Sequence, residues 1–288
     1  SLALSIILLM GAALAMTAKA QQPNLTVLQN GFQVVVAEDD RFPLVSIRLY
    51  VHAGSAYETD EEAGISHLLE HMVFKSTEKR PEGGVSLDVT SNGGYMNAAT
   101  SLDYTVYKVD MPSDKWALGM DILHDMIFGA KFVPEELESV RGVVIAELER
   151  NEDDPGRRLF KRLQGQVWEG TTYGRPIIGY KETVEGFTSQ DLKDYVAKFY
   201  QPQSMVLVVC GNVDEAQVID EAQKLYGTME NTSNLTPPQA FAIQAGQEPK
   251  VYVEEGPWQK AYVKVAFPIP DFANDRAVGF DIISEVLG

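Results

Sequence analysis

The chain has 288 residues, of which 45% are hydrophobic and 23% are charged, as in an ordinary globular protein. Its net charge of −17 argues against nucleic acid and anionic membrane surfaces as partners. The charge favours basic substrates, although an acidic surface that only confers solubility explains it equally well.

The first twenty residues are predicted to form a cleavable signal peptide. Leu2 to Ala18 is almost wholly apolar, and Ala18-Lys19-Ala20 before Gln21 has the small residues of a cleavage site. A retained membrane anchor is the alternative, because this apolar run nearly spans a bilayer. Since the chain has one cysteine, a bacterial periplasm is a better match than a disulfide-rich extracellular setting. We therefore expect a periplasmic or secreted protein, with a membrane-anchored one as the alternative.

Residues 21–226 are predicted to form one domain of strands and helices. Asn30-Gly31 is a hairpin signal between two strands, and a third strand leads into a helix that follows the capping box Thr59–Glu62. Cys210 lies in an apolar run, which predicts a buried strand thiol and not a nucleophile. Strands are predicted at 25–28, 32–37, 44–52, 95–99, 102–111 and 205–211, and helices at 114–128, 134–153, 155–168, 189–199 and 214–226.

The helix after the capping box carries the most informative motif of the chain, His67-Leu68-Leu69-Glu70-His71. The two histidines are four residues apart, so they lie one helical turn apart and can bind a single ion. Glu70 shares their face and could take a proton from a metal-bound water. Two imidazoles and a carboxylate are typical zinc ligands, and the order is the inverse of the commoner His-Glu-x-x-His motif. A chance spacing on a solvated helix is the alternative, and a third ligand would decide against it.

Glu147 is the best candidate for that third ligand. It lies in the predicted helix 134–153, on the side of the apolar residues Val140 and Val144, whereas Glu149 and Glu152 point elsewhere. A carboxylate on a core-facing stripe must be paired or must bind a metal. The helix by itself leaves a salt bridge to an arginine and metal ligation equally open, and the upstream motif favours metal.

The motif and its surroundings resemble the pitrilysin-type, or inverzincin, zinc peptidases. The resemblance runs from about residue 26 to the C-terminus and is nearest to the shorter bacterial and mitochondrial-processing-peptidase-like members. In that family, the third zinc ligand is a glutamate 76 positions beyond the second histidine, which is the position of Glu147. The segments that carry the resemblance are 64–77, 93–101, 103–107, 152–155, 173–179, 199–202 and 208–214.

The resemblance implies a zinc-dependent endopeptidase that hydrolyses peptides or unfolded polypeptides. Zn²⁺ would be bound by His67, His71 and Glu147, and Glu70 would be the general base on the zinc-bound water. Asn97 and Ala98 would line the cleft, where an edge strand can pair with an extended peptide.

The resemblance also implies an α+β fold of tandem homologous domains, each an antiparallel sheet packed with helices. Residues 227–249 are predicted to be a linker. Residues 250–288 would begin a second, truncated domain, with strands at 250–255 and 261–267 and a helix from Asn274 to Leu287. In the family, an arginine and a tyrosine late in the second domain help to bind the substrate, and no position of this chain matches them.

Three functional alternatives stay open at this point. The first is an active endopeptidase, because the chain keeps the full ligand set. The second is a non-catalytic subunit of a peptidase-like complex. The third is a catalytic half that needs a partner chain, in a homodimer or a heterodimer, to supply the missing arginine and tyrosine. His52 and His124 are expected to be structural.

Overall fold

The computed structural model describes residues 22–232, 234–235, 238, 250–269, 274 and 277–287. The predicted signal peptide, its membrane-anchor alternative and most of the predicted linker therefore lie outside the described residues. Among the helices within these ranges, none has both the length and the apolar character that crossing a membrane requires.

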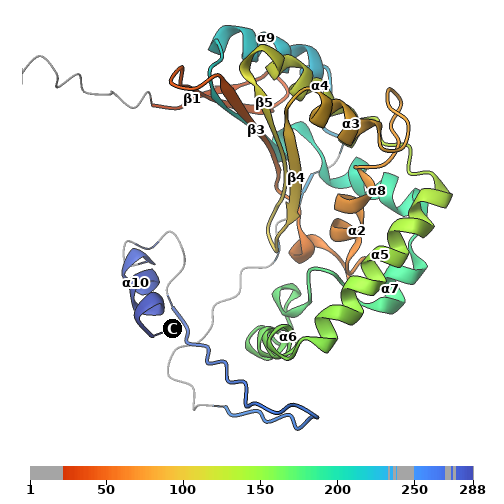
Figure 1. The fold of residues 1–288 in the computed structure, drawn as a ribbon, viewed down its shortest axis with the longest axis vertical. Helices are drawn as coiled ribbons and strands as arrows, with labels where there is room; N and C mark the ends of the chain where they lie inside the picture. The colour runs from red at the N-terminus through yellow and green to blue at the C-terminus, as the bar shows by residue number, and fades with distance from the viewer. Residues whose placement is uncertain are drawn as a thin grey trace, which may run out of the picture.

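A six-stranded sheet forms the centre of the fold (Figure 1). The strands are β1 Asn24–Val27, β2 Gln33–Glu38, β3 Leu44–Val51, β4 Tyr95–Thr100, β5 Thr105–Pro112 and β6 Met205–Gly211. Their order across the sheet is β1-β2-β6-β3-β5-β4, so β4 lies at one edge. The predicted α+β class is confirmed. The sheet is antiparallel except that β6 pairs in parallel with β2. The long segment between these two strands provides the crossover that a parallel pair needs.

Helices pack against one face of this sheet and around its β4 edge. They are α2 Ile65–Met72, α3 Gly84–Ser91, α4 Trp116–Phe128, α5 Pro134–Asp153, α6 Pro155–Val167, α7 Lys181–Gly186, α8 Ser189–Phe199 and α9 Glu215–Tyr226. A further helix, α10 Ala277–Leu287, lies apart from the sheet (Figure 1). Four short 3-10 turns lie at Ser55–Tyr57, Ser113–Lys115, Thr172–Gly174 and Pro202–Ser204. The sequence pattern did not predict α3 and α7, because both are short and rich in small or polar residues.

Alternation along the strands places the core on the helix-facing side of the sheet. Val45, Ile47 and Leu49 of β3 are fully buried there, whereas the residues between them are more exposed. Cys210 of β6 belongs to the other face and is exposed. The prediction of a buried thiol was wrong, since the apolar run concealed which of its residues face the helices.

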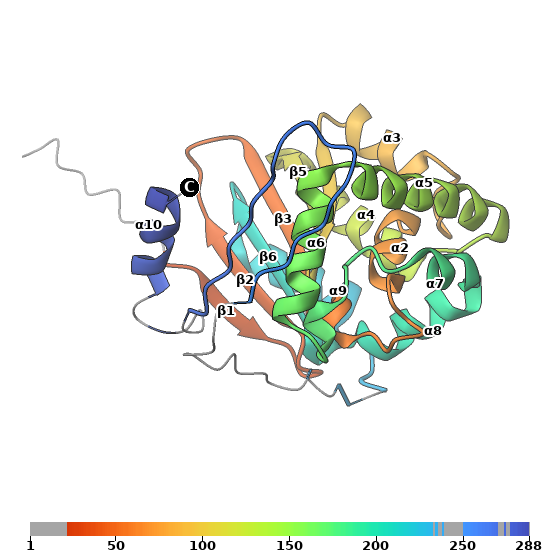
Figure 2. The same ribbon diagram turned by 90° about the horizontal axis from the view of Figure 1, so that it is seen from below.

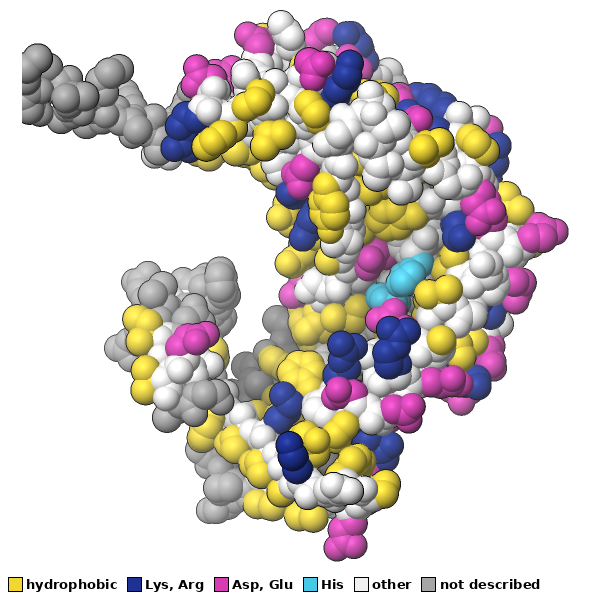
Figure 3. Space-filling model, viewed as in Figure 1, with side chains coloured by type: hydrophobic (Ala, Val, Ile, Leu, Met, Phe, Trp, Pro, Cys, Tyr) yellow, Lys and Arg dark blue, Asp and Glu magenta, His cyan; other side chains and the backbone are white. Residues whose placement is uncertain are grey.

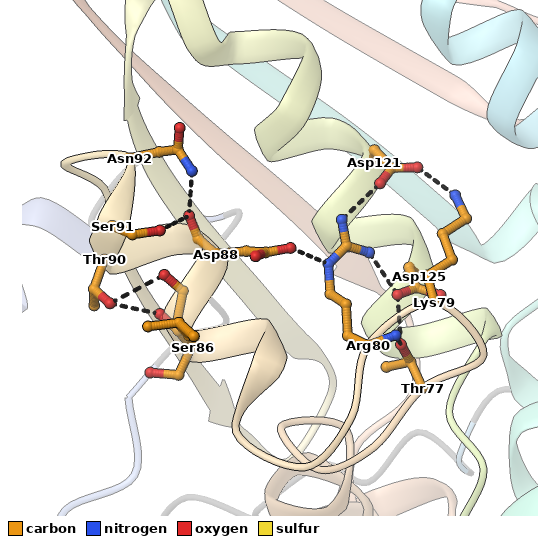
Figure 4. A network of polar contacts seen from close by, with 11 residues as sticks. Thr77, Lys79, Arg80, Ser86, Asp88, Thr90, Ser91, Asn92, Asp121 and Asp125 are labelled. Carbon is orange, nitrogen blue, oxygen red and sulfur yellow. Dashed lines mark hydrogen bonds and ion pairs between the residues drawn. The ribbon is translucent and has the colours of Figure 1, made fainter.

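An arginine in the loop after α2 ties that loop to two helices (Figure 4). Arg80 is 8% exposed and pairs with Asp88 of α3 at 2.8 Å and with Asp121 and Asp125 of α4 at 2.8 and 2.5 Å. The Thr77 hydroxyl donates to the same Asp125 carboxylate at 2.5 Å. A buried arginine with three carboxylate partners is well compensated, so this network fixes the chain that leaves α2.

The segment 250–269 runs beside α6 as extended chain (Figure 2). Glu254 pairs with Arg158 of α6, and the Arg158 guanidinium lies over the Trp258 ring. The two strands predicted here are not formed, and their apolar side chains are exposed. The physical reason is that an isolated hairpin is marginal until a third strand or a helix covers its apolar face. The predicted helix is confirmed as α10, although it begins at Ala277.

Candidate metal centre

The motif helix α2 begins where two glycines let two loops meet. Gly64 has a left-handed backbone (φ +96°), and an added Cβ would approach the Ile178 carbonyl oxygen to 2.6 Å. Gly179 (φ +77°) would likewise meet the Ala63 carbonyl oxygen at 2.3 Å. Only glycine tolerates both the conformation and the contact. The predicted capping box is formed, with Thr59 and Glu62 exchanging hydrogen bonds of 3.0 and 3.3 Å, but it closes the turn before the helix.

The first turn of α2 is held by a buried carboxyl group. Glu58 is 3% exposed, and its oxygens accept the backbone N–H groups of Gly64 and Ser66, each at 2.9 Å. Arg175 donates to the carbonyl oxygen of Glu58 and pairs with Asp60 at 2.6 Å. Burial raises the pKa of Glu58 to about 7 against the opposing effect of its hydrogen bonds. Glu58 therefore satisfies N–H groups that would otherwise lack partners at the helix start.

The structure brings the three predicted metal ligands together. One ligand atom from each of His67, His71 and Glu147 lies within 4.8 Å of the other two. Glu147 Oε2 of α5 is 3.9 Å from His67 Nε2 and 3.8 Å from His71 Nε2. The three side chains are 13%, 29% and 31% exposed in the order His67, His71, Glu147. Figure 3 shows histidine side chains next to acidic ones in a hollow of the concave face.

The chemistry of this donor set fits a zinc ion. The separations are too long for direct hydrogen bonds. The two separations from Glu147 are about half an ångström above the roughly 3.3 Å expected between ligand atoms that share one tetrahedral zinc. Burial and the neighbouring His71 lower the pKa of His67 to about 4, so its imidazole is neutral at pH 7, which is the metal-binding form. The Nδ1 atom of His67 is buried and has no hydrogen-bond partner among the described residues.

Glu70 points from α2 toward the end of the edge strand β4. The Thr100 hydroxyl donates to Glu70 Oε2 at 2.7 Å. The Glu70 carboxylate is also close enough to His67 to favour that imidazole's protonated form. A carboxylate therefore stands beside the three candidate ligands without being one of them.

The structure separates the two residues that were predicted to line the cleft. The Ala98 side chain faces the helices and is buried in the core. Asn97 is exposed on the opposite face of β4, and its side-chain oxygen accepts the Ala98 N–H at 2.9 Å. Both residues contribute main-chain groups to the edge of the sheet. Because the Ala98 side chain is buried, any contact of Ala98 with an extended peptide would be through its backbone.

The sequence pattern did not indicate three residues that lie around α2, namely Glu58, Thr100 and Arg175. Glu58 precedes the capping box and carries no local signal. Thr100 and Arg175 lie within segments that carry the family resemblance, but nothing in their spacing relates them to α2. Of the histidines outside the motif, His52 accepts or donates a 2.7 Å hydrogen bond with Tyr57, and His124 packs against Phe128 and Tyr226.

Comparison with known protein families identifies the same region. The model of the insulinase family, peptidase family M16, matches residues 33–181, which include α2, β4 and α5. The chain belongs to this family. A second model, the peptidase M16 inactive domain, matches residues 186–288. The resemblance to pitrilysin-type peptidases is thereby confirmed.

Several curated proteins and solved structures of proteases are similar to this chain in sequence and fold. An uncharacterised zinc protease of Rickettsia felis is 31% identical over 216 residues, which are 74% of this chain and 52% of the relative. The mitochondrial-processing peptidase subunit beta of Bos taurus is 28% identical over 281 residues, or 96% of this chain and 56% of that protein. The periplasmic protease PqqL of Escherichia coli superposes with a TM-score of 0.71 at 26% identity, over 78% of this chain and 26% of that one. The chain thus spans about half the length of these curated relatives.

Proposed function

We propose that this protein is a zinc-dependent endopeptidase that hydrolyses peptides or unfolded polypeptides, with Glu70 as its general base. The observation that carries the proposal is the group of three ligand atoms from His67, His71 and Glu147, gathered beside the Glu70 carboxylate. Membership of a peptidase family and the proteases among the relatives support the reaction class.

His67, His71 and Glu147 would hold the zinc with no fourth protein ligand. When bound, zinc supplies Lewis-acid chemistry that activates water and polarises a peptide carbonyl. The neutral state of His67 favours this role, because its low pKa avoids competition from a proton at pH 7.

Glu70 would move the proton during hydrolysis. Its carboxylate accepts a proton from the attacking water and then donates it to the amide nitrogen of the leaving peptide. The edge strand β4 offers unpaired main-chain groups to an extended substrate, with Asn97 and Ala98 in the segment that would pair with it.

The protein would act together with further structure from a second domain or from a partner chain. The chain spans about half of its curated relatives, and one of those is named as a subunit. A homodimer or a heterodimer with a related chain would complete the cleft, and a non-catalytic subunit is the alternative. The predicted signal peptide and the periplasmic relative support a periplasmic location.

Replacement of Glu70 by glutamine tests the function directly. We expect Glu70→Gln to keep zinc and the fold, and to lower the rate of peptide cleavage by about 10²- to 10⁴-fold, because a general base is lost. Zinc is measured by metal analysis, and turnover with an unfolded fluorogenic polypeptide. The control is Glu149→Gln, at an exposed carboxylate of α5 that pairs with Lys181. Cleavage by Glu70→Gln at the wild-type rate would exclude the proposed mechanism.

A further inference from the structure

We propose that Thr100 is a positioning residue for Glu70. This inference rests on the proposed function, since it concerns the base of that reaction. In the described part of the chain, the Thr100 hydroxyl is the one hydrogen-bond partner of the Glu70 carboxylate, at 2.7 Å from Oε2. The other carboxylate oxygen, Oε1, has no hydrogen-bond partner among the described residues. A single donor on one oxygen thus selects which oxygen can act as the base.

The backbone around Thr100 is fixed by strand pairing. Thr100 is the last residue of β4 and pairs with Thr105, the first residue of β5. Its side chain lies on the same face of the strand as the buried Ala98, which is the face toward α2. Threonine is branched at Cβ and has few rotamers in a strand, so its hydroxyl direction follows from the backbone.

A buried polar layer behind this pair stiffens the support. Thr105 is fully buried and donates to the Ala53 carbonyl oxygen at 2.9 Å. The hydroxyls of Tyr107 and Tyr200 share a 2.7 Å hydrogen bond, and both rings are buried. Because this layer is satisfied internally, it offers no competing partner to the Thr100 hydroxyl. On the other side, Glu58 holds the start of α2, so both ends of the Thr100–Glu70 contact belong to rigid elements.

Without the Thr100 hydroxyl, Glu70 would keep its place in the chain but lose its preferred orientation. The side chain of glutamate has three rotatable bonds, and here one hydrogen bond restrains it. Catalytic groups that are displaced by about 1 Å lose about 100-fold in rate. The effect should fall on turnover and not on zinc content, because Thr100 contacts the base and none of the candidate zinc ligands.

Crystal structures of the metal-free protein test the positioning without reference to activity. The wild type should show Thr100 Oγ1 within hydrogen-bond distance of Glu70 Oε2. In Thr100→Val, which keeps the shape and favours strand structure, the Glu70 carboxylate should adopt a different rotamer or several. An unchanged Glu70 rotamer in this variant would overturn the proposal.

The second test is the steady-state kinetics of the full-length protein. We expect Thr100→Val to lower kcat by about 10- to 100-fold with zinc content nearly unchanged. KM should also change little, because the replacement leaves the main-chain groups of β4 in place. Thr100→Ser restores the hydroxyl and should recover most of kcat. The matched control is Thr26→Val in β1, at the opposite edge of the sheet, which makes the same replacement in a strand far from Glu70, so kcat should be kept.

The outcomes separate the two proposals. A loss of kcat in Thr26→Val equal to that in Thr100→Val, or no rescue by Thr100→Ser, would show a general structural effect and overturn the positioning role. If the zinc-loaded wild type cleaves no peptide, the proposed function fails, and the crystal structures alone then decide the role of Thr100.

Discussion

The three candidate ligands are not equally buried. His67 is the most buried of the three, and its environment keeps the imidazole neutral at pH 7. His71 and Glu147 are about equally exposed and approach from two separate helices. A centre of this kind needs all three donors, because each alone is too exposed or too weak to hold an ion.

Loss of one donor should therefore remove most of the metal. We expect His71→Ala and Glu147→Gln each to lower zinc affinity by more than the roughly 10- to 100-fold that loss of an outer-shell partner costs. Metal analysis and competition with a chelator measure this change. The control Glu149→Gln lies two residues from Glu147 on the same helix and should retain zinc. Full zinc occupancy in either ligand variant would remove that residue from the centre.

At the scale of elements, α2 depends on its first turn. The Glu58 carboxyl group and Arg175 clamp the loop that enters the helix, and glycines 64 and 179 allow the close approach of a second loop. The Arg80 network fixes the chain after α2 in the same way. The motif helix is thus held at both ends by buried ionisable groups. Of these, Glu58 makes the stability depend on pH, because its pKa is raised to about 7.

Glu58 should make the protein less stable as the pH rises from about 4.5 to about 7. Its pKa is raised from 4.5 to about 7, so the folded protein keeps a proton that the unfolded chain releases in this window. The free energy of unfolding should fall by up to about 3 kcal/mol across the window from this group alone. The measurement is the difference in unfolding free energy between the wild type and Glu58→Gln from pH 4.5 to 8. Parallel curves for the two proteins would show that Glu58 does not titrate in this range.

At the scale of the whole molecule, the C-terminal region stays separate from the main core. The helix α10 exposes Ile282, Ile283 and Val286, and the extended segment 250–269 also exposes apolar side chains. Contiguous apolar surface of this kind is a site of association.

We expect residues 21–288 to self-associate through α10 as protein concentration rises. Replacing Ile282, Ile283 and Val286 by serine should shift the protein toward monomer and leave zinc binding intact, because α10 lies apart from α2 and α5 (Figure 1). Sedimentation velocity over a concentration series measures the effect. The control is Val143→Ser, at an exposed position of α5. Association that persists in the α10 variant would assign it to another surface.

Local pattern by itself was enough to predict most elements between residues 21 and 226. Periodicity and capping signals predicted α5 and α8 at their observed bounds, and the Asn30-Gly31 turn predicted the β1–β2 hairpin. The motif spacing and the family resemblance together named the four residues that the structure gathers at the candidate centre. Spacing works there because His67, Glu70 and His71 share one helix, whose geometry fixes their relation.

Tertiary structure decided what depends on residues far apart in the chain. The parallel pairing of β6 with β2, the exposed face of Cys210 and the placement of Asn97 away from α2 follow from the assembled sheet. The support of Glu70 by Thr100 joins residues thirty positions apart, and the clamp of Arg175 on Glu58 spans 117 positions. Such contacts have no local signature, since they form only when packing brings the backbone of one element to the side chains of another. Between 250 and 267, the strand pattern is present in the sequence, but no strand forms among the described residues, because a strand needs a partner to bury its apolar face.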